Sequence, residues 1–299
     1  MASLGRVSRD GAIDLLFLVP TLALVVGLLA YPLASGVALS LHSARGFELT
    51  GFVGLENYAR AILGDAVFHR SLANTVVFTV AAVALQIGVG LLLAVFVAGA
   101  RRGRTVLLLA FSAPFVLATV AVGAVWKFMY APHFGLVPTI GAALGLDTAT
   151  VAPLADTGTA LWAVVAAFVW RFAGFTMVVY LAGIQGISRD YYDHAVLEGA
   201  GPWARLRHIT WPMLWPQTFA LVVLGTIGAL RTFDMVWIMT SGGPSHATET
   251  VATHVYSTAF RFLDVGYAQS MAMLLLVVIL ALTIVEYRLL KRRAELATS

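Results

Sequence analysis

The sequence has no cysteine and is poor in charge. Asp, Glu, Lys and Arg make up 11% of its 299 residues, whereas soluble globular chains carry about 25%. The hydrophobic share is 60% and the mean hydropathy is +0.88. Without cysteine there is no disulfide framework, thiolate metal site or cysteine nucleophile. The shortage of charge leaves too little polar surface for a soluble fold of this length, so a lipid bilayer is the expected solvent.

Lysine is scarce as well, and this excludes one large class of enzyme. The only lysines are Lys127 and Lys291, and neither is followed by Ser or Thr, so the Gly-Lys-Ser/Thr end of a nucleotide-binding P-loop is absent. The sequence also lacks His-Glu-x-x-His, Gly-x-Ser-x-Gly and paired intramembrane carboxylates. We therefore expect no catalytic residue, metal site or resident cofactor. The histidines of the outer connections are expected to be separate surface or capping residues. They are His42, His133, His246 and His254.

Six apolar stretches are long enough to cross the hydrocarbon core as helices, which takes about 20 residues each. A chain with this pattern is expected to be an all-α membrane protein with six transmembrane helices, forming a single transmembrane domain over residues 1–299. The stretches are Leu15–Leu41, Asn74–Ala100, Thr105–Trp126, Thr157–Gln185, Met213–Thr240 and Val265–Val285. Kinks are expected at the prolines in or beside them, which are Pro20, Pro32, Pro114 and Pro216.

The positive charges predict the orientation of these spans. Lys and Arg stand at the ends of apolar runs rather than in one patch, which favours membrane orientation over nucleic-acid binding as their role. The richer side holds Arg6, Arg9, Arg101, Arg102, Arg104, Arg189, Arg205, Arg207, Arg288, Lys291, Arg292 and Arg293, and the poorer side holds Arg45, Arg60, Arg70, Lys127 and Arg261. Both termini and the connection 187–216 are therefore expected in the cytoplasm, and the connections 42–73 and 241–264 outside.

The inner connection between the fourth and fifth spans reads ISRDYYDHAVLEGAGPWARLRHITWPMLWP. Ser188 or Asp190 is suited to begin a short helix, because both side chains cap helix N-termini. Gly199 and Gly201 are suited to end it, and Pro202 fits the first turn of a second helix. The pattern predicts a compact helix–turn–helix on the cytoplasmic face, acting as an interfacial anchor or as a knob that inserts into another protein.

This stretch resembles the cytoplasmic "EAA" loop of binding-protein-dependent ABC importer permeases, whose pattern is Glu-Ala-Ala, three residues, Gly and, further on, Ile-x-Leu-Pro. The resemblance implies that this loop couples the permease to its ATPases. The implied coupling residues are Asp193, His194, Ala195, Gly199, Ala200, Ile209 and Pro212. The chain departs from the family pattern at Asp193, His194 and Trp211, where the family has Glu, Ala and Leu.

Five further segments resemble, in the same order, those of the carbohydrate-type permeases of the maltose and glycerol-phosphate systems. They read GFVGLENYARAIL, NTVVFTVAAVALQIGVGLLLA, WKFMYAPHFGLV, FDMVWIMTSGGPSHATET and YSTAFRFLDVGYA. The resemblance implies the type I importer permease fold in a bacterial inner membrane and a sugar, polyol or glycerol-phosphate-like solute. It also implies a second permease subunit, two ATPase subunits that bind ATP and Mg, and an extracytoplasmic solute-binding protein.

Charges inside the spans are functional candidates, because an unpaired charge in the bilayer costs several kcal/mol. Arg231 and Asp234 stand three apart, so in a continuous helix they would either pair and brace the bundle or line a cavity. Arg171 beside Trp170 is likewise a packing or a lining residue. The candidate translocation path is Trp170, Arg171, Arg231, Phe233, Asp234 and Trp237.

An ion-gradient-driven secondary transporter is the competing interpretation. It predicts inverted repeats and several buried carboxylates as proton or sodium sites. Within the expected spans only Asp234 is a carboxylate. The sequence therefore favours a permease subunit that relies on separate ATPases.

Overall fold

The computed structural model describes residues 18–46, 48–100, 102–132, 134–145 and 152–298, with side chains to Leu289 apart from that of Arg45. Several residues used for the orientation or the first span therefore lie outside the described residues or side chains. They are Arg6, Arg9, Leu15, Arg45, Arg101, His133, Lys291, Arg292 and Arg293. The chain forms two compact units. One comprises Met1–Gly64 and Val255–Leu274, and the other Asp65–His254 and Leu275–Ser299.

The first unit contains the first span and a small hairpin. A helix runs over Leu18–Ser40, with a π-helical turn at Val26–Ala30 before α2 (Tyr31–Ser40). Strands β1 (His42–Arg45) and β2 (Glu48–Phe52) pair antiparallel with His42 opposite Phe52, which the all-α expectation missed. The helix is hardly covered by protein, since only 6% of its most apolar window is buried.

A short helix follows the hairpin within this unit. It comprises α3 (Glu56–Ala59) and a π-helical turn over Arg60–Gly64. The amide of Asn57 donates to the carbonyls of Ser40 and His42, at 3.0 and 3.1 Å. Arg60 forms an ion pair with Asp264 at 2.9 Å. These contacts tie the short helix to the strand β1 and to Asp264, which directly precedes α15 (Val265–Thr298); the π-helical turn Ser257–Arg261 belongs to the same unit.

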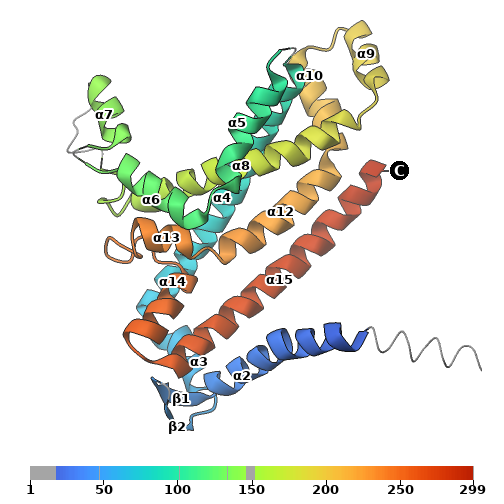
Figure 1. Cartoon of the computed structure of the whole chain (residues 1–299). Helices are drawn as coiled ribbons and strands as arrows, with labels where there is room; N and C mark the ends of the chain where they lie inside the picture. The colour runs from blue at the N-terminus through green and yellow to red at the C-terminus, as the bar shows by residue number, and fades with distance from the viewer. Residues whose placement is uncertain (1–17, 47, 101, 133, 146–151, 299) are drawn as a thin grey trace, which may run out of the picture. The chain divides into compact units, whose positions relative to one another are not determined.

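The core of the second unit lies between α4 (Ala66–Gly99) and α8 (Ala160–Gln185), with α5 (Arg104–Val116) and α12 (Trp215–Leu230) packed against them (Figure 1). Glycines permit the close approach. A Cβ at Gly90 would lie 2.3 Å from Thr176, and one at Gly174 would lie 2.0 Å from the backbone carbonyl oxygen of Phe111. The largest buried side chains of this core include Phe78, Met177, Tyr180 and Leu221.

The third expected span, Thr105–Trp126, is broken near Pro114, where a kink was expected, and the break is a full interruption of the helix. Helix α5 ends at Val116, α6 (Thr119–Met129) starts after an extended Leu117 and Ala118, and the two helices are bent by 100°. Pro114 lies near the break and has no N–H to continue the helical ladder. A short helix, α7 (Leu136–Ala143), follows α6.

The fifth expected span is also interrupted. The helical run Pro202–Met213 comprises α10 (Pro202–Arg205), a π-helical turn over Leu206–Thr210 and α11 (Trp211–Met213), and it is bent by 69° from α12. Helix α12 stops at Leu230, and a separate helix, α13 (Asp234–Met239), begins after the non-helical residues 231–233. A continuous fifth helix to Thr240 was therefore a wrong prediction. The hydroxyl of Thr250 donates to the carbonyl of Thr232 at this break, at 3.3 Å.

Span count and hydropathy agree with the sequence. The described residues contain four helices long and apolar enough to cross a membrane, namely Leu18–Ser40, α4, α8 and the Val265–Leu289 part of α15. The bent pairs α5/α6 and Pro202–Met213/α12 bring the number to six if each pair is one span. The remaining helices are α9 (Arg189–Leu197) and α14 (Val251–Tyr256).

The close packing of α5 on α8 yields a stability prediction. Gly174→Ala places a methyl group against the backbone of Phe111, and such overpacking should lower the free energy of unfolding by about 1–3 kcal/mol. Gly88→Ala is the matched control, since a Cβ there meets nothing within 4 Å. Thermal denaturation of the two variants in detergent checks this, and equal midpoints would contradict the packing described here.

Candidate functional site

The connection between α8 and α12 is a helical hairpin with well-formed caps. The Ser188 hydroxyl accepts from the Asp190 N–H at 3.3 Å, and α9 ends at Gly199, whose φ is +79°. The N–H of Gly199 donates to Val196 O at 3.0 Å and that of Ala200 to Ala195 O at 2.8 Å, which is the Schellman pattern of a helix C-terminus. The predicted helix, its stop at Gly199 and the second helix starting at Pro202 are confirmed.

The two arms of the hairpin are tied together at the root and exposed at the tip. The hydroxyls of Tyr192 and Thr210 are 2.9 Å apart and form a hydrogen bond between the arms. At the tip, Leu197 is 84% exposed and Trp203 is 69% exposed. Figure 1 shows α9 and α10 projecting together from the ends of α8 and α12. An apolar tip on a projecting hairpin is typical of a surface that another protein covers.

The residues suggested by the family resemblance lie in different surroundings along this hairpin. Asp193, His194 and Gly199 are exposed near the tip, and Ala195 and Ala200 are half-buried. Ile209 packs against the core and Pro212 is exposed at the root. Along the second arm, Trp203 faces outward, whereas Leu206 and Ile209 contact the core.

An aromatic pocket of about 240 Å³ opens between α4, α5, α8 and α12. Its aromatic lining is Phe115, Phe168, Phe172 and Phe175. Phe115 and Phe175 are stacked with centroids 4.9 Å apart, and Phe168 and Phe172 are 4.5 Å apart. The pocket therefore offers flat apolar faces inside the bundle.

Gln86 is the polar side chain of this pocket. It is only 3% exposed, and its Nε2 donates to the hydroxyl of Thr176 at 2.8 Å. Within the part of the chain that the structure describes, Oε1 is buried and accepts no hydrogen bond. A buried acceptor without a donor is costly, so this oxygen suits a ligand hydroxyl. Sequence reasoning missed this pocket. Its signals were the spacing of Phe168, Phe172 and Phe175, which puts them on one helix face, and an amide within an apolar span.

Arg171 hydrogen-bonds to the backbone at the break in the third span. Its Nε and Nη2 donate to the carbonyl of Leu117, at 3.3 and 3.1 Å, and its guanidinium lies 4.6 Å from the ring centroid of Phe172. Leu117 stands at the C-terminal end of α5, where free carbonyls and the helix dipole favour a cation. Asp234 also attracts this guanidinium electrostatically. Arg171 therefore both packs and borders the pocket.

The other expected path residues are distributed differently from the prediction. Arg231 and Asp234 are both exposed, the helix break separates them, and no ion pair joins them in the described structure. The rings of Phe233 and Trp237 stack with centroids 5.6 Å apart. Trp170 is 43% exposed and packs edge-on against Trp126, which is not among the expected path residues. The bracing ion pair was one of two alternatives and required a continuous helix, which the chain does not form here.

The outer histidines agree only in part with the sequence-based expectation. His246 is exposed, as expected, but His254 is buried, and both rings contact the buried carboxylate of Glu249. His42 contacts the Ala38 carbonyl through Nδ1, at 2.7 Å.

Comparison with known proteins identifies a family and several similar chains. The family described as "Binding-protein-dependent transport system inner membrane component" matches residues 86–295. The probable ABC transporter permease protein YurN of Bacillus subtilis is 34% identical over 97% of this chain and 99% of its own length. The trehalose/maltose transport system permease protein MalF of Thermococcus litoralis is 32% identical, covering 96% of each chain. The sn-glycerol-3-phosphate transport system permease protein UgpA of Agrobacterium fabrum is 31% identical, covering 94% of this chain and 95% of the relative.

A solved structure shares the fold. A chain from a bacterial ABC transporter involved in the import of the acidic polysaccharide alginate superposes with a TM-score of 0.82 at 21% identity, covering 96% of this chain and 99% of that one. A second structure, of the alginate transporter in complex with a pentasaccharide-bound periplasmic protein, gives a TM-score of 0.83 at 20% identity and covers 98% and 99% of the two chains. The type I importer permease fold is thereby confirmed.

The bond between Arg171 and the broken span can be tested through stability. Arg171→Met leaves the Leu117 carbonyl without its donors, which should cost about 1–3 kcal/mol. Arg171→Lys should recover part of the loss, because an ammonium still donates. Arg231→Met at the exposed end of α12 serves as control and should be nearly neutral. Thermal midpoints in detergent measure the series, and an equal effect of both Met substitutions would argue against the capping role.

Proposed function

Because the chain belongs to the family of binding-protein-dependent transport system inner membrane components, and so is a permease subunit of an ABC importer, we propose that its hairpin 187–216 couples separate ATPase subunits to a path through the bundle for a sugar, polyol or glycerol-phosphate-like solute. The observation that carries this proposal is the capped, projecting hairpin with its exposed apolar tip. No comparison favours the ion-gradient alternative.

The coupling role follows from the mechanics of the hairpin. A hairpin whose helices are capped can transmit a displacement of its apolar tip to the helices at its root, whereas a flexible loop would not. The left-handed turn at Gly199 sets the angle between the arms, and the bond between Tyr192 and Thr210 keeps them together. The ATPase subunits would bind at Asp193 and the residues around it. Their movement would displace the hairpin and, through it, the ends of α8 and α12.

The solute class rests on the aromatic pocket and on the relatives. Sugar rings stack on aromatic faces, and their hydroxyls need acceptors in an otherwise apolar site. The pocket supplies phenylalanine rings and the unpartnered oxygen of Gln86. Relatives are named for lactose, trehalose or maltose, and glycerol 3-phosphate transport. Arg171, whose guanidinium lies over the pocket residue Phe172, would add a polar group, and the path would also include Asp234 and the stacked rings of Phe233 and Trp237.

The assembly we propose contains a second, homologous permease subunit, two ATPase subunits that hold ATP and Mg, and an extracytoplasmic solute-binding protein. The chain itself would contribute no resident cofactor and contact no nucleic acid. Both termini would be cytoplasmic and the connections 42–73 and 241–264 would face outward, since the positive charges favour that orientation. Residues 1–299 would act as one permease domain in the inner membrane.

The coupling role can be tested at two glycines of the hairpin. Gly199→Val forces a β-branched side chain into the left-handed region and should deform the turn, with strain of about 1–3 kcal/mol. In the assembled complex it should reduce solute uptake severalfold while ATP hydrolysis continues. Gly201→Val is the matched control, because its φ of −69° suits valine. At both positions a Cβ meets nothing within 4 Å.

Uptake and ATPase rates in proteoliposomes separate the outcomes. Loss of coupling in Gly199→Val alone supports the proposal. Unchanged uptake in a variant that assembles normally, or equal loss in both variants, counts against it.

The pocket oxygen yields a separate prediction. Gln86→Leu removes the acceptor and should raise the KM for uptake about tenfold, the equivalent of one lost hydrogen bond of about 1 kcal/mol or slightly more. Thr176→Val breaks the same Gln86–Thr176 bond but keeps Oε1, so its KM should change less. Uptake of maltose, lactose and glycerol 3-phosphate is measured for each variant, and a KM that is the same in Gln86→Leu as in the parent would remove Gln86 from the path.

A further inference from the structure

A buried carboxylate organises the loop between α13 and α14. Glu249 is 5% exposed, and its Oε2 contacts Nδ1 of His246 while its Oε1 lies 3.3 Å from Nδ1 of His254. The other ring nitrogen of His254, Nε2, lies 3.3 Å from Oδ2 of Asp65. Oδ1 of Asp65 in turn accepts the N–H groups of Val67 and Phe68, which caps α4. A polar chain therefore runs from the loop to the first turn of α4.

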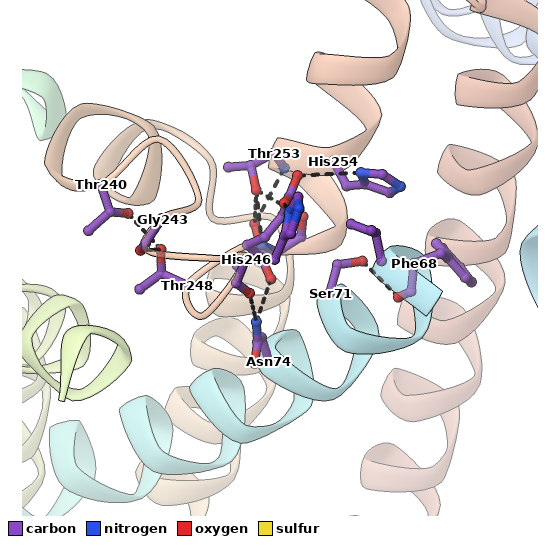
Figure 2. A network of polar contacts seen from close by, with 12 residues as sticks. Phe68, Ser71, Asn74, Thr240, Gly243, His246, Thr248, Thr253 and His254 are labelled. Atoms are coloured by element: carbon purple, nitrogen blue, oxygen red, sulfur yellow. Dashed lines mark hydrogen bonds and ion pairs between the residues drawn. The ribbon is translucent and has the colours of Figure 1, made fainter. Parts of the chain in front are cut away.

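Backbone contacts fasten the same loop to α4. Asn74 donates to the carbonyls of His246 and Glu249, both at 2.9 Å, and the hydroxyl of Thr75 accepts the N–H of Val251 at 3.0 Å. Figure 2 shows His246 and His254 gathered over the turns of α4 that carry Ser71 and Asn74. The loop is also tied to α13, through the bond between the hydroxyls of Thr240 and Thr248 at 2.7 Å.

The geometry fixes the charge of His254. An ionised carboxylate only accepts hydrogen bonds, and a neutral imidazole has a single N–H. Because both ring nitrogens of His254 face carboxylate oxygens, both contacts are satisfied only when the ring is an imidazolium. Loss of one proton would leave one carboxylate facing a nitrogen lone pair inside a largely buried site.

We propose that His254 is a positioning residue whose imidazolium helps to fasten the 241–250 loop to the start of α4, so that the attachment of the loop weakens when the external pH rises. The loop directly follows α13, which carries the candidate path residues Asp234 and Trp237. The effect on transport rests on the function proposed above, whereas the fastening itself does not.

The charges around His254 give the direction of the pH dependence. Burial alone would lower the pKa of His254, but the hydrogen bonds and charges of Glu249 and Asp65 outweigh it and raise the pKa above 6.5. Burial alone would raise the pKa of Glu249, but His254 and His246 outweigh it and lower the pKa below 4.5. The first turns of α4 add the exposed His69 and Arg70.

The direction of the pH dependence follows from the linkage between protonation and stability. The contribution of His254 is fully present below pH 6.5 and is lost as the pH rises through its raised pKa. The contribution of Glu249 is present above pH 4.5 and is lost only as the pH falls through its lowered pKa. The contact between the loop and α4 is therefore strongest between pH 4.5 and pH 6.5, and it weakens as the pH rises through the raised pKa of His254.

Single cysteines report the opening, because the chain has no cysteine of its own. Ala247→Cys places a thiol in the loop where the side chain is 4% exposed, and Ser245→Cys places one at an exposed position nearby. Maleimide labelling rates are measured on the full chain in its assembled complex. The ratio of the two rates cancels the ordinary pH dependence of thiols. It should rise severalfold between about pH 6 and about pH 9.

Two substitutions assign this rise to His254. His254→Gln should flatten the ratio, whereas His42→Gln, outside the network, should leave it unchanged. Asp65→Asn keeps a good N-cap residue but removes one carboxylate charge, so it should move the midpoint of the rise to lower pH. Asp65→Asn still tests the role of His254 in the event that His254→Gln fails to assemble. A flat ratio in the parent, or a midpoint that Asp65→Asn does not move, would overturn the proposal.

Uptake separates this proposal from the function it builds on. In proteoliposomes with varied external pH, the parent should lose uptake over the range in which labelling rises, and His254→Gln should not show that step. Absence of uptake at every pH with a normal labelling step would contradict the proposed function and leave the fastening intact. A labelling step without any change in uptake would overturn the link between the loop and transport.

Discussion

The structure depends on one constraint, which is that backbone polar groups inside a bilayer must find partners within the protein. An unbroken helix meets this constraint by itself, whereas the chain interrupts two of its spans. At the first break, Arg171 donates to the carbonyl of Leu117, and at the second, Thr250 donates to the carbonyl of Thr232. The breaks are therefore stabilised by residues far away in the sequence. The first lies beside the aromatic pocket, which Phe115 lines, and the second lies between α12 and α13.

Helices α4 and α8 supply the rigid frame on which these irregular parts depend. Gly90 and Gly174 let neighbouring backbones approach, and the bond between Gln86 and Thr176 joins the two helices inside the core. The hairpin 187–216 leaves from the end of α8, and the 241–250 loop is hydrogen-bonded to the start of α4. Under the proposed coupling, displacement of the hairpin would act on this frame.

Hydropathy predicted six spans, and the capping rules predicted the hairpin with its stop at Gly199, because both signals are local in sequence. The prolines predicted kinks near two of the helix interruptions, but not their extent, because the apolar run continues through residues 117–118 and hydropathy carries no information on backbone angles. An Arg231–Asp234 ion pair, one of the two alternatives, required a continuous helix, and α12 ends before Arg231. The His254 network was missed because Asp65 and His254 are 189 residues apart, a distance over which one sequence carries no pairing signal.

The central claim is that the hairpin 187–216 is the contact with separate ATPases on the cytoplasmic side. Its most direct test is site-specific cross-linking in the assembled complex, with a single cysteine at the tip in Leu197→Cys, where the side chain is 84% exposed. The account predicts a cross-link from this position to an ATPase subunit and none from Leu63→Cys, which is 82% exposed in the connection expected outside. Labelling of Leu197→Cys by a membrane-impermeant reagent added outside intact cells, with no cross-link to an ATPase, would contradict it.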